Sequence, residues 1–111
     1  MKTNSIITAL SALAQETRLA VFRLLVTAGP EGLTPGKIAE KLDLPSATLS
    51  FHLKELSHSG LIVSRQESRF IYYSADYKAM NALIAFLTEN CCSGEACETS
   101  SAEVCKPVQR T

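Results

Sequence analysis

Residues 34–73 restrict the fold of this 111-residue chain more than any other segment. Thr34 followed by Pro35 is typical of a helix start, because threonine caps the helix end and proline suits the first turn. Ile38 and Leu42 then supply the apolar face of a short helix, and residues 43–45 form a turn. The pattern predicts one short helix that ends in a tight turn.

A second short helix follows this turn. We expect Ser46 to cap it, and Leu49, Leu53 and Leu56 form a buried stripe at helical spacing. Gly60 then ends the helix. Two short helices joined by about three residues stand at a large angle, so the second can project from the domain.

Two β-rich runs come directly after Gly60. Residues 61–65 and 70–74 are separated by the polar residues 66–69, a connection of hairpin length. The connection has no glycine, so it does not predict a turn type.

Three further helices are expected around this unit. Residues 5–13 carry an apolar stripe of Ile6, Leu10 and Leu13. Residues 16–28 are apolar nearly all round, and Gly29 ends this helix. Residues 77–90 are capped by Asp76 and carry a stripe that includes Met80, Leu83 and Leu87. The predicted fold class is mainly α with a β-hairpin, in the order of a winged helix-turn-helix domain.

This order of elements predicts DNA binding. A projecting helix fits the major groove, and the hairpin would flank it as a wing. The candidate DNA-binding residues are Ser46, Thr48, Ser50, Phe51, His52 and Lys54 on the helix, and Arg65 and Arg69 at the hairpin tip. For Phe51 two interpretations stay open: contact with a thymine methyl group, or packing back onto the hairpin.

Bulk charge does not identify the function. The net charge is zero, and residues 34–74 carry five basic and four acidic side chains. A protein-interaction module would have a similar solvated helix face, but the order of elements, with basic residues at both places where a duplex would lie, favours DNA. His52 and His58 are far in sequence from every cysteine, so we predict no enzyme and no catalytic cofactor.

Composition indicates one folded domain, with 46% apolar and 20% charged residues. The apolar runs are too short to span a bilayer, so we expect a cytoplasmic protein without a membrane partner.

All four cysteines lie within the last 21 residues. The sequence therefore divides into a DNA-binding domain, residues 1–90, and a cysteine-containing tail, residues 91–111, expected to be flexible without a ligand. Cys91, Cys92 and Cys97 are the candidate metal ligands, because Gly94 allows the chain to fold back. Cys105 is a weaker candidate, because its return requires ordering a serine-rich stretch.

Residues 13–25, 38–42, 44–62 and 69–73 together resemble the ArsR family of bacterial metalloregulatory repressors. The resemblance spans roughly residues 10–87. It implies a homodimer that pairs through its first and last helices and binds double-stranded operator DNA. Two known types of site are missing: residues 33–38 contain no thiol, and residues 77–90 contain no histidine. The cysteine tail is similar to that of a subset that senses trivalent arsenic.

The chemistry of the tail favours arsenic(III) as the effector. Thiolate-only sites select soft ions, and the spacing of the cysteines disfavours a four-thiolate zinc site. Glu89, Glu95 and Glu98 crowd the thiols at a helix C-terminus, which disfavours thiolate charge. Arsenite or antimonite forms a neutral centre with three thiols. A thiol redox sensor, a divalent-metal sensor and thiols without a function remain alternatives.

Overall fold

The structure, a computed structural model, describes residues 2–94. Five helices and one hairpin follow each other in the predicted order. Their bounds are α1 (Thr3–Leu13), α2 (Glu16–Ala28), α3 (Pro35–Leu42), α4 (Ser46–His58), β1 (Ile62–Glu67), β2 (Phe70–Ala75) and α5 (Tyr77–Leu87), followed by the 3₁₀ turn Cys91–Gly94. The predicted fold class is confirmed.

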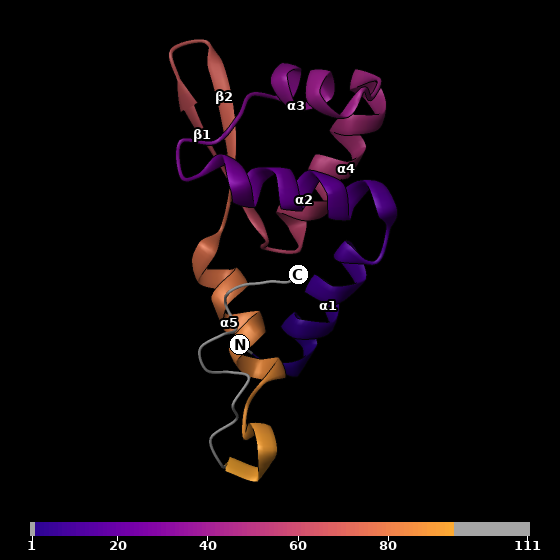
Figure 1. Ribbon diagram of the computed structural model, residues 1–111. Coiled ribbons are helices and arrows are strands. Elements are labelled where there is room, and N and C mark those ends of the chain that lie inside the picture. Colours follow the sequence, from indigo (N-terminus) through magenta and orange to yellow (C-terminus); the bar gives the residue numbers. More distant parts are fainter. Residues whose placement is uncertain (1, 95–111) are drawn as a thin grey trace.

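The elements divide between the two ends of the molecule (Figure 1). The hairpin, α3 and α4 occupy one end, while α1 and α5 lie side by side at the other. α2 crosses between them and contacts α1, α3, α4 and β2. The helix predicted over residues 16–28, which is apolar nearly all round, therefore lies at the centre of the fold.

The core forms where the apolar faces of these elements meet. Its largest fully buried side chains come from α2, α3, α4 and the residue before β1: Val21, Leu25, Ile38, Leu49, Leu56 and Leu61. The periodicity that predicted α3 and α4 thus also identified the residues that hold them against α2. No helix within residues 2–94 is long and apolar enough to cross a membrane.

Most helix ends follow their predicted signals. Thr34 accepts a hydrogen bond from the backbone N–H of Lys37 at 3.3 Å, and Asp76 accepts one from that of Ala79 at 3.1 Å. Gly29 ends α2 with a φ of 93°. The cap predicted for α4 is wrong, because Pro45 holds the N-cap position and Ser46 is already the first helical residue.

Two predicted boundaries also need correction. α5 ends at Leu87 rather than at residue 90, and Cys91–Gly94 of the expected tail form a 3₁₀ turn. The hairpin strands are longer than predicted, so that Glu67 pairs with Phe70 across a turn made of Ser68 and Arg69 alone.

The wing is attached to the rest of the domain by a short backbone bridge. Leu33 and Tyr73 exchange two hydrogen bonds, from Leu33 N–H to Tyr73 O at 2.9 Å and from Tyr73 N–H to Leu33 O at 2.8 Å. The loop before α3 thus pairs with the outer edge of β2. This pairing fixes the hairpin relative to α3.

Candidate DNA-binding surface and thiol pair

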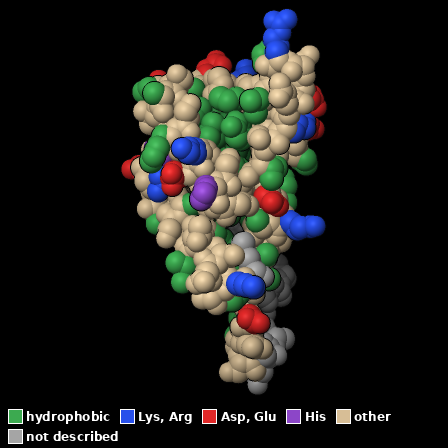
Figure 2. Space-filling model, turned by 180° about the vertical axis from the view of Figure 1, so that it is seen from behind, with side chains coloured by type: hydrophobic (Ala, Val, Ile, Leu, Met, Phe, Trp, Pro, Cys, Tyr) green, Lys and Arg blue, Asp and Glu red, His purple; other side chains and the backbone are tan. Residues whose placement is uncertain are grey.

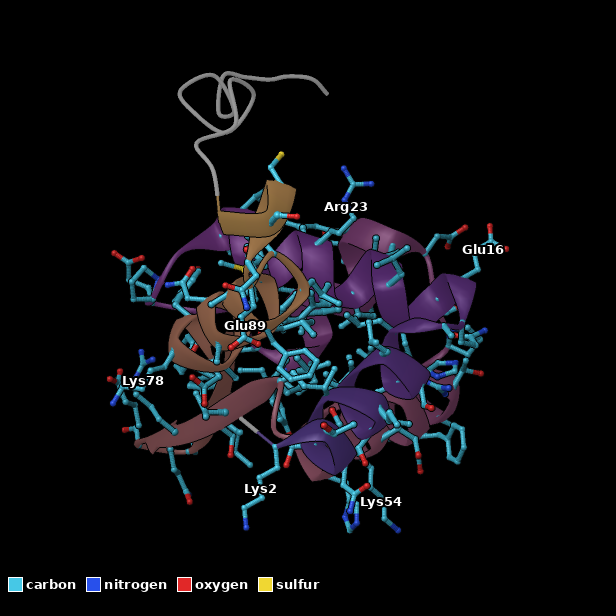
Figure 3. The ribbon with its side chains drawn as sticks, turned by 90° about the horizontal axis from the view of Figure 1, so that it is seen from below. Lys2, Glu16, Arg23, Lys54, Lys78 and Glu89 are labelled. Carbon is cyan, nitrogen blue, oxygen red and sulfur yellow. The ribbon has the colours of Figure 1, made fainter. Side chains whose placement is uncertain are left out.

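The exposed face of α4 carries most of the predicted DNA-binding residues. Ser46, Thr48, Ser50, Phe51 and Lys54 are exposed, while Leu49, Leu53 and Leu56 are buried on the opposite face. Viewed from the end that carries α1 and α5, Lys54 extends outward at the edge of the molecule (Figure 3). α4 therefore presents a row of hydroxyl groups, one phenyl ring and one ammonium group to solvent.

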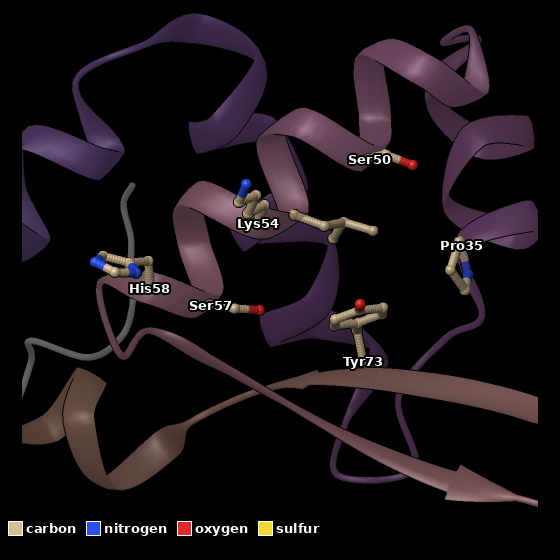
Figure 4. Close-up of a pocket in the computed structure, with 7 residues that line it drawn as sticks. Pro35, Ser50, Lys54, Ser57, His58 and Tyr73 are labelled. Carbon is tan, nitrogen blue, oxygen red and sulfur yellow. The ribbon is translucent and has the colours of Figure 1, made fainter.

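A groove runs between α4 and the wing (Figure 4). Its volume is about 500 Å³, and Ser50, Lys54 and Ser57 line one side of it, with Tyr73 of β2 opposite. Sequence reasoning did not identify Tyr73 as a groove residue. Its position depends on the Leu33–Tyr73 pairing, which joins residues far apart in the chain.

His52 does not lie on the exposed face, and its predicted exposure is wrong. Only 8% of its surface is exposed, because it belongs to the buried face formed with Leu49, Leu53 and Leu56. The positions 49, 52, 53 and 56 have the spacing of one helical face, and this signal was available in the sequence.

The His52 imidazole is part of a polar contact between three helices. Arg18 of α2 donates from Nε to the carbonyl oxygen of Ala12, in the last turn of α1, at 2.7 Å. Its Nη1 lies 3.4 Å from Nδ1 of His52. Because a guanidinium group only donates, a hydrogen bond here requires Nδ1 to accept, which corresponds to a neutral ring with its proton on Nε2. Sequence reasoning missed Arg18.

The surroundings of His52 favour this neutral form. Burial, and then the positive charge of Arg18, lower the pKa of His52 from its usual value of 6.5, against an opposite effect of Glu55. The contact therefore holds α1, α2 and α4 together at neutral pH.

The two arginines of the wing have different surroundings. Arg69 is exposed in the turn, as predicted. Arg65 is not at the tip, because it pairs with Tyr72 inside the hairpin. Its Nε donates to Glu67 at 2.9 Å, its Nη1 donates to the Glu31 carbonyl oxygen at 3.0 Å, and its guanidinium lies 4.9 Å from the centre of the Tyr72 ring. Arg65 thus helps to hold the wing against the loop that contains Glu31.

Charged side chains of both signs are interspersed on the face shown in Figure 2, without one broad basic patch. This agrees with the zero net charge of the chain. Any DNA affinity must therefore depend on a few placed cations rather than on the field of the whole protein.

Two of the predicted metal ligands lie together at the end of α5. The sulfur atoms of Cys91 and Cys92 are 3.8 Å apart, and both residues are exposed. Cys97 and Cys105 lie outside the described residues. Within residues 2–94, no three His, Cys, Asp or Glu side chains form a group that could hold a metal ion.

The stripes expected to form the dimer interface are divided between core and surface. Ile6 and Leu83 are buried within the single chain, with 2% and 6% exposed. Leu10 and Leu87, by contrast, are 40% and 59% exposed. Their neighbours Ile7 and Ile84 are also exposed, so both helices keep exposed apolar side chains, Ile7 and Leu10 on α1 and Ile84 and Leu87 on α5.

Comparison with known proteins agrees with this geometry. Residues 13–65 match the family of helix-turn-helix domains. The chain is 41% identical over 63 residues to the uncharacterized HTH-type transcriptional regulator YceK of Bacillus subtilis, a match that covers 57% of this chain and 62% of YceK. The chain thus spans less than two thirds of YceK.

A second relative is matched in sequence and in structure. The transcriptional activator HlyU of Vibrio cholerae is 31% identical over 78 residues, which cover 70% of this chain and 69% of HlyU. The solved structure of HlyU superposes with a TM-score of 0.64 at 29% identity, over 83% of this chain and 99% of that one.

An ArsR-like transcriptional regulator from Rhodococcus has the same fold, with a TM-score of 0.71 at 24% identity over 82% of each chain. The match to HlyU covers more than two thirds of that protein at over 30% identity. The chain belongs to the ArsR family of winged helix-turn-helix transcriptional regulators.

Proposed function

We propose that this protein is an arsenic(III)-responsive transcriptional repressor that binds operator DNA as a homodimer and leaves it when trivalent arsenic or antimony binds its C-terminal cysteines. The observation that carries the effector assignment is the pair of thiols of Cys91 and Cys92, whose sulfur atoms are 3.8 Å apart at the end of α5. A pair of adjacent sulfurs suits a small thiophilic centre.

The donor set fits a neutral arsenic centre. When three thiols condense with arsenous acid, three As–S bonds replace three As–OH bonds, and each thiol proton leaves with a hydroxyl group as water. No thiolate charge persists, which suits thiols close to Glu89 and to the negative end of a helix. Cys97 is the third ligand in this proposal.

DNA binding is assigned to the exposed face of α4 and to the wing tip. Ser46, Thr48 and Ser50 offer hydroxyl groups to base edges and phosphates, and Lys54 and Arg69 offer positive charge to phosphates. Two recognition helices of a dimer would read half-sites about 34 Å apart. Arg65 contributes indirectly, because it holds the wing in place.

The exposed surface of Ile7, Leu10, Ile84 and Leu87 supports dimer formation, since pairing removes these side chains from water. Residues 88–90 separate the end of α5, which carries part of this surface, from Cys91 and Cys92. A centre that draws the tail together at this point would change the angle between the two DNA-reading ends and favour a dimer that no longer fits both half-sites. If bound arsenic lowers the affinity of the protein for DNA by a given factor, bound DNA must lower its affinity for arsenic by the same factor.

A titration of labelled operator tests this proposal. A duplex selected from a random pool by the protein itself is followed by fluorescence anisotropy, with and without arsenite, in a phosphine reductant that does not compete as a thiol. We expect arsenite to weaken DNA binding of the wild type by about tenfold or more. Cys91→Ser should keep its DNA affinity and lose this response, whereas Cys105→Ser should keep both.

Other outcomes reject specific parts of the proposal. A full arsenite response in Cys91→Ser would reject the thiol site. Failure of the wild type to select any duplex would reject DNA reading itself. Because the paired sulfurs also suit oxidation, a response to peroxide but not to arsenite would identify a thiol redox sensor instead.

A further inference from the structure

Phe51 is an exposed phenyl ring at the centre of the outward face of α4. Its exposed fraction is 56%, whereas Leu49 and Leu53 on either side of it in the sequence are almost fully buried. Successive helical residues are about 100° apart, so Phe51 lies on the opposite side of α4 from Leu49. The ring therefore points away from the core.

The ring of Phe51 is held by a buried neighbour. It meets the imidazole of His52 edge to face, with ring centres 5.5 Å apart and an angle of 66° between the planes. His52 is only 8% exposed and contacts Arg18, whose Nε donates to Ala12. An exposed side chain next to such an anchored ring loses less rotational freedom on binding than an isolated one.

The neighbours of Phe51 indicate the chemistry of its partner. Ser50 and Thr48 flank it with hydroxyl groups, and Lys54 lies one turn further along the exposed face. Hydroxyl groups can bind base edges and a cation can bind phosphates, so this combination around one apolar ring suits a groove of DNA. The apolar surface suited to a second protein chain lies elsewhere, on α1 and α5.

A phenyl ring neither donates nor accepts a hydrogen bond at a base edge. In the major groove, the distinctive apolar group is the C5-methyl group of thymine. We infer that Phe51 determines sequence specificity by packing against a thymine methyl group in each half-site, with His52 as its positioning residue. This inference rests on the proposed DNA-binding function and names the chemical group of DNA that the exposed face of α4 recognises.

Removal of single methyl groups tests the inference directly. In a duplex selected by the wild type, each thymine of the half-sites is replaced in turn by deoxyuridine, which lacks only the methyl group. At one such position, we expect the replacement to raise the dissociation constant of the duplex about fourfold when one half-site is changed and about fifteenfold when both are changed. Phe51→Ala should bind the thymine and uracil duplexes equally, while Phe51→Leu, which keeps an apolar side chain, should retain a preference for thymine.

Phe70→Ala is the matched control. Phe70 is a phenylalanine of similar exposure, 54%, but it lies on the wing, so its replacement should leave the thymine-to-uracil ratio unchanged. A wild type that binds its selected duplex but discriminates at no thymine would overturn the inference and leave the proposed function intact. Equal discrimination by Phe51→Ala and the wild type would overturn it as well. A wild type that selects no duplex would reject both.

Discussion

Single contacts decide how the recognition helix is held. The backbone hydrogen bonds of α4 would form with many sequences. The link from the carbonyl oxygen of Ala12 through Arg18 to His52 joins three helices, and Arg18 and His52 are 34 residues apart in the sequence. One end of this link lies in α1, which also carries the exposed side chains of Ile7 and Leu10, and the other lies beside Phe51. Arg18 and His52 therefore connect α1 with α4.

The histidine of this link predicts a pH dependence of stability. Because the folded protein lowers the pKa of His52, the unfolded chain binds more protons below the usual pKa of 6.5. The neutral ring therefore contributes fully to stability above this pH, and the contribution is lost as the pH falls below it. His52→Gln, which can still accept from Arg18 but does not titrate, should flatten the pH dependence of the free energy of unfolding.

Urea unfolding followed by circular dichroism between about pH 5 and about pH 7.5 measures this effect. His58→Gln replaces the exposed histidine and serves as the control. Equal slopes in the two variants would contradict a role for His52.

At the level of elements, the wing depends on one glycine in the loop before α3. Gly32 has a φ of 77°, and a Cβ atom at this position would collide with the carbonyl oxygen of Tyr73. The neighbouring Leu33 makes the two hydrogen bonds that attach β2 to the loop. Only a residue without a side chain allows the loop to approach the strand this closely.

Gly32→Ala should lower the free energy of unfolding by about 2–4 kcal/mol, because it adds both a left-handed alanine and a backbone clash. Gly36→Ala is the matched control. Gly36 lies in α3 with open space around its Cα, so its replacement should stabilise the protein by about 0.5 kcal/mol. Chemical denaturation measures both, and equal stabilities of the two variants would refute the role of Gly32.

At the scale of the whole molecule, the proposed function assigns DNA reading to one end and dimerisation to the other. α4 and the wing lie at one end, and α1 and α5 at the other (Figure 1). Cys91 and Cys92 follow α5 in the chain, so the proposed arsenic site comes after a helix that is assigned to the dimer interface. In this proposal a signal received there reaches the DNA through the relative orientation of two subunits rather than through contact with DNA.

This arrangement predicts that a charge on the apolar surface of α5 separates the subunits. Ile84 is 51% exposed, and Ile84→Glu should raise the dimer dissociation constant by about tenfold or more, because it places a carboxylate in an apolar contact. Sedimentation equilibrium measures the change. Phe70→Glu, a similar change at the wing, should leave the dimer unaffected, and an unchanged mass distribution for Ile84→Glu would exclude this surface as the interface.

The sequence by itself determined the elements, their order and the family. These properties follow from local signals: apolar residues at helical spacing, the Thr34 and Asp76 caps, the Gly29 stop, and two β-rich runs around a short polar connection. They depend on residues a few positions apart, so no tertiary contact is needed to identify them.

Only the tertiary structure decided which partners the side chains contact. It placed the imidazole of His52 against Arg18, 34 residues away, and the guanidinium of Arg65 against the carbonyl oxygen of Glu31, also 34 residues away. It divided the stripes of α1 and α5 into buried and exposed halves. Sequence periodicity identifies an apolar face but not its partner, because that choice depends on how the whole chain packs.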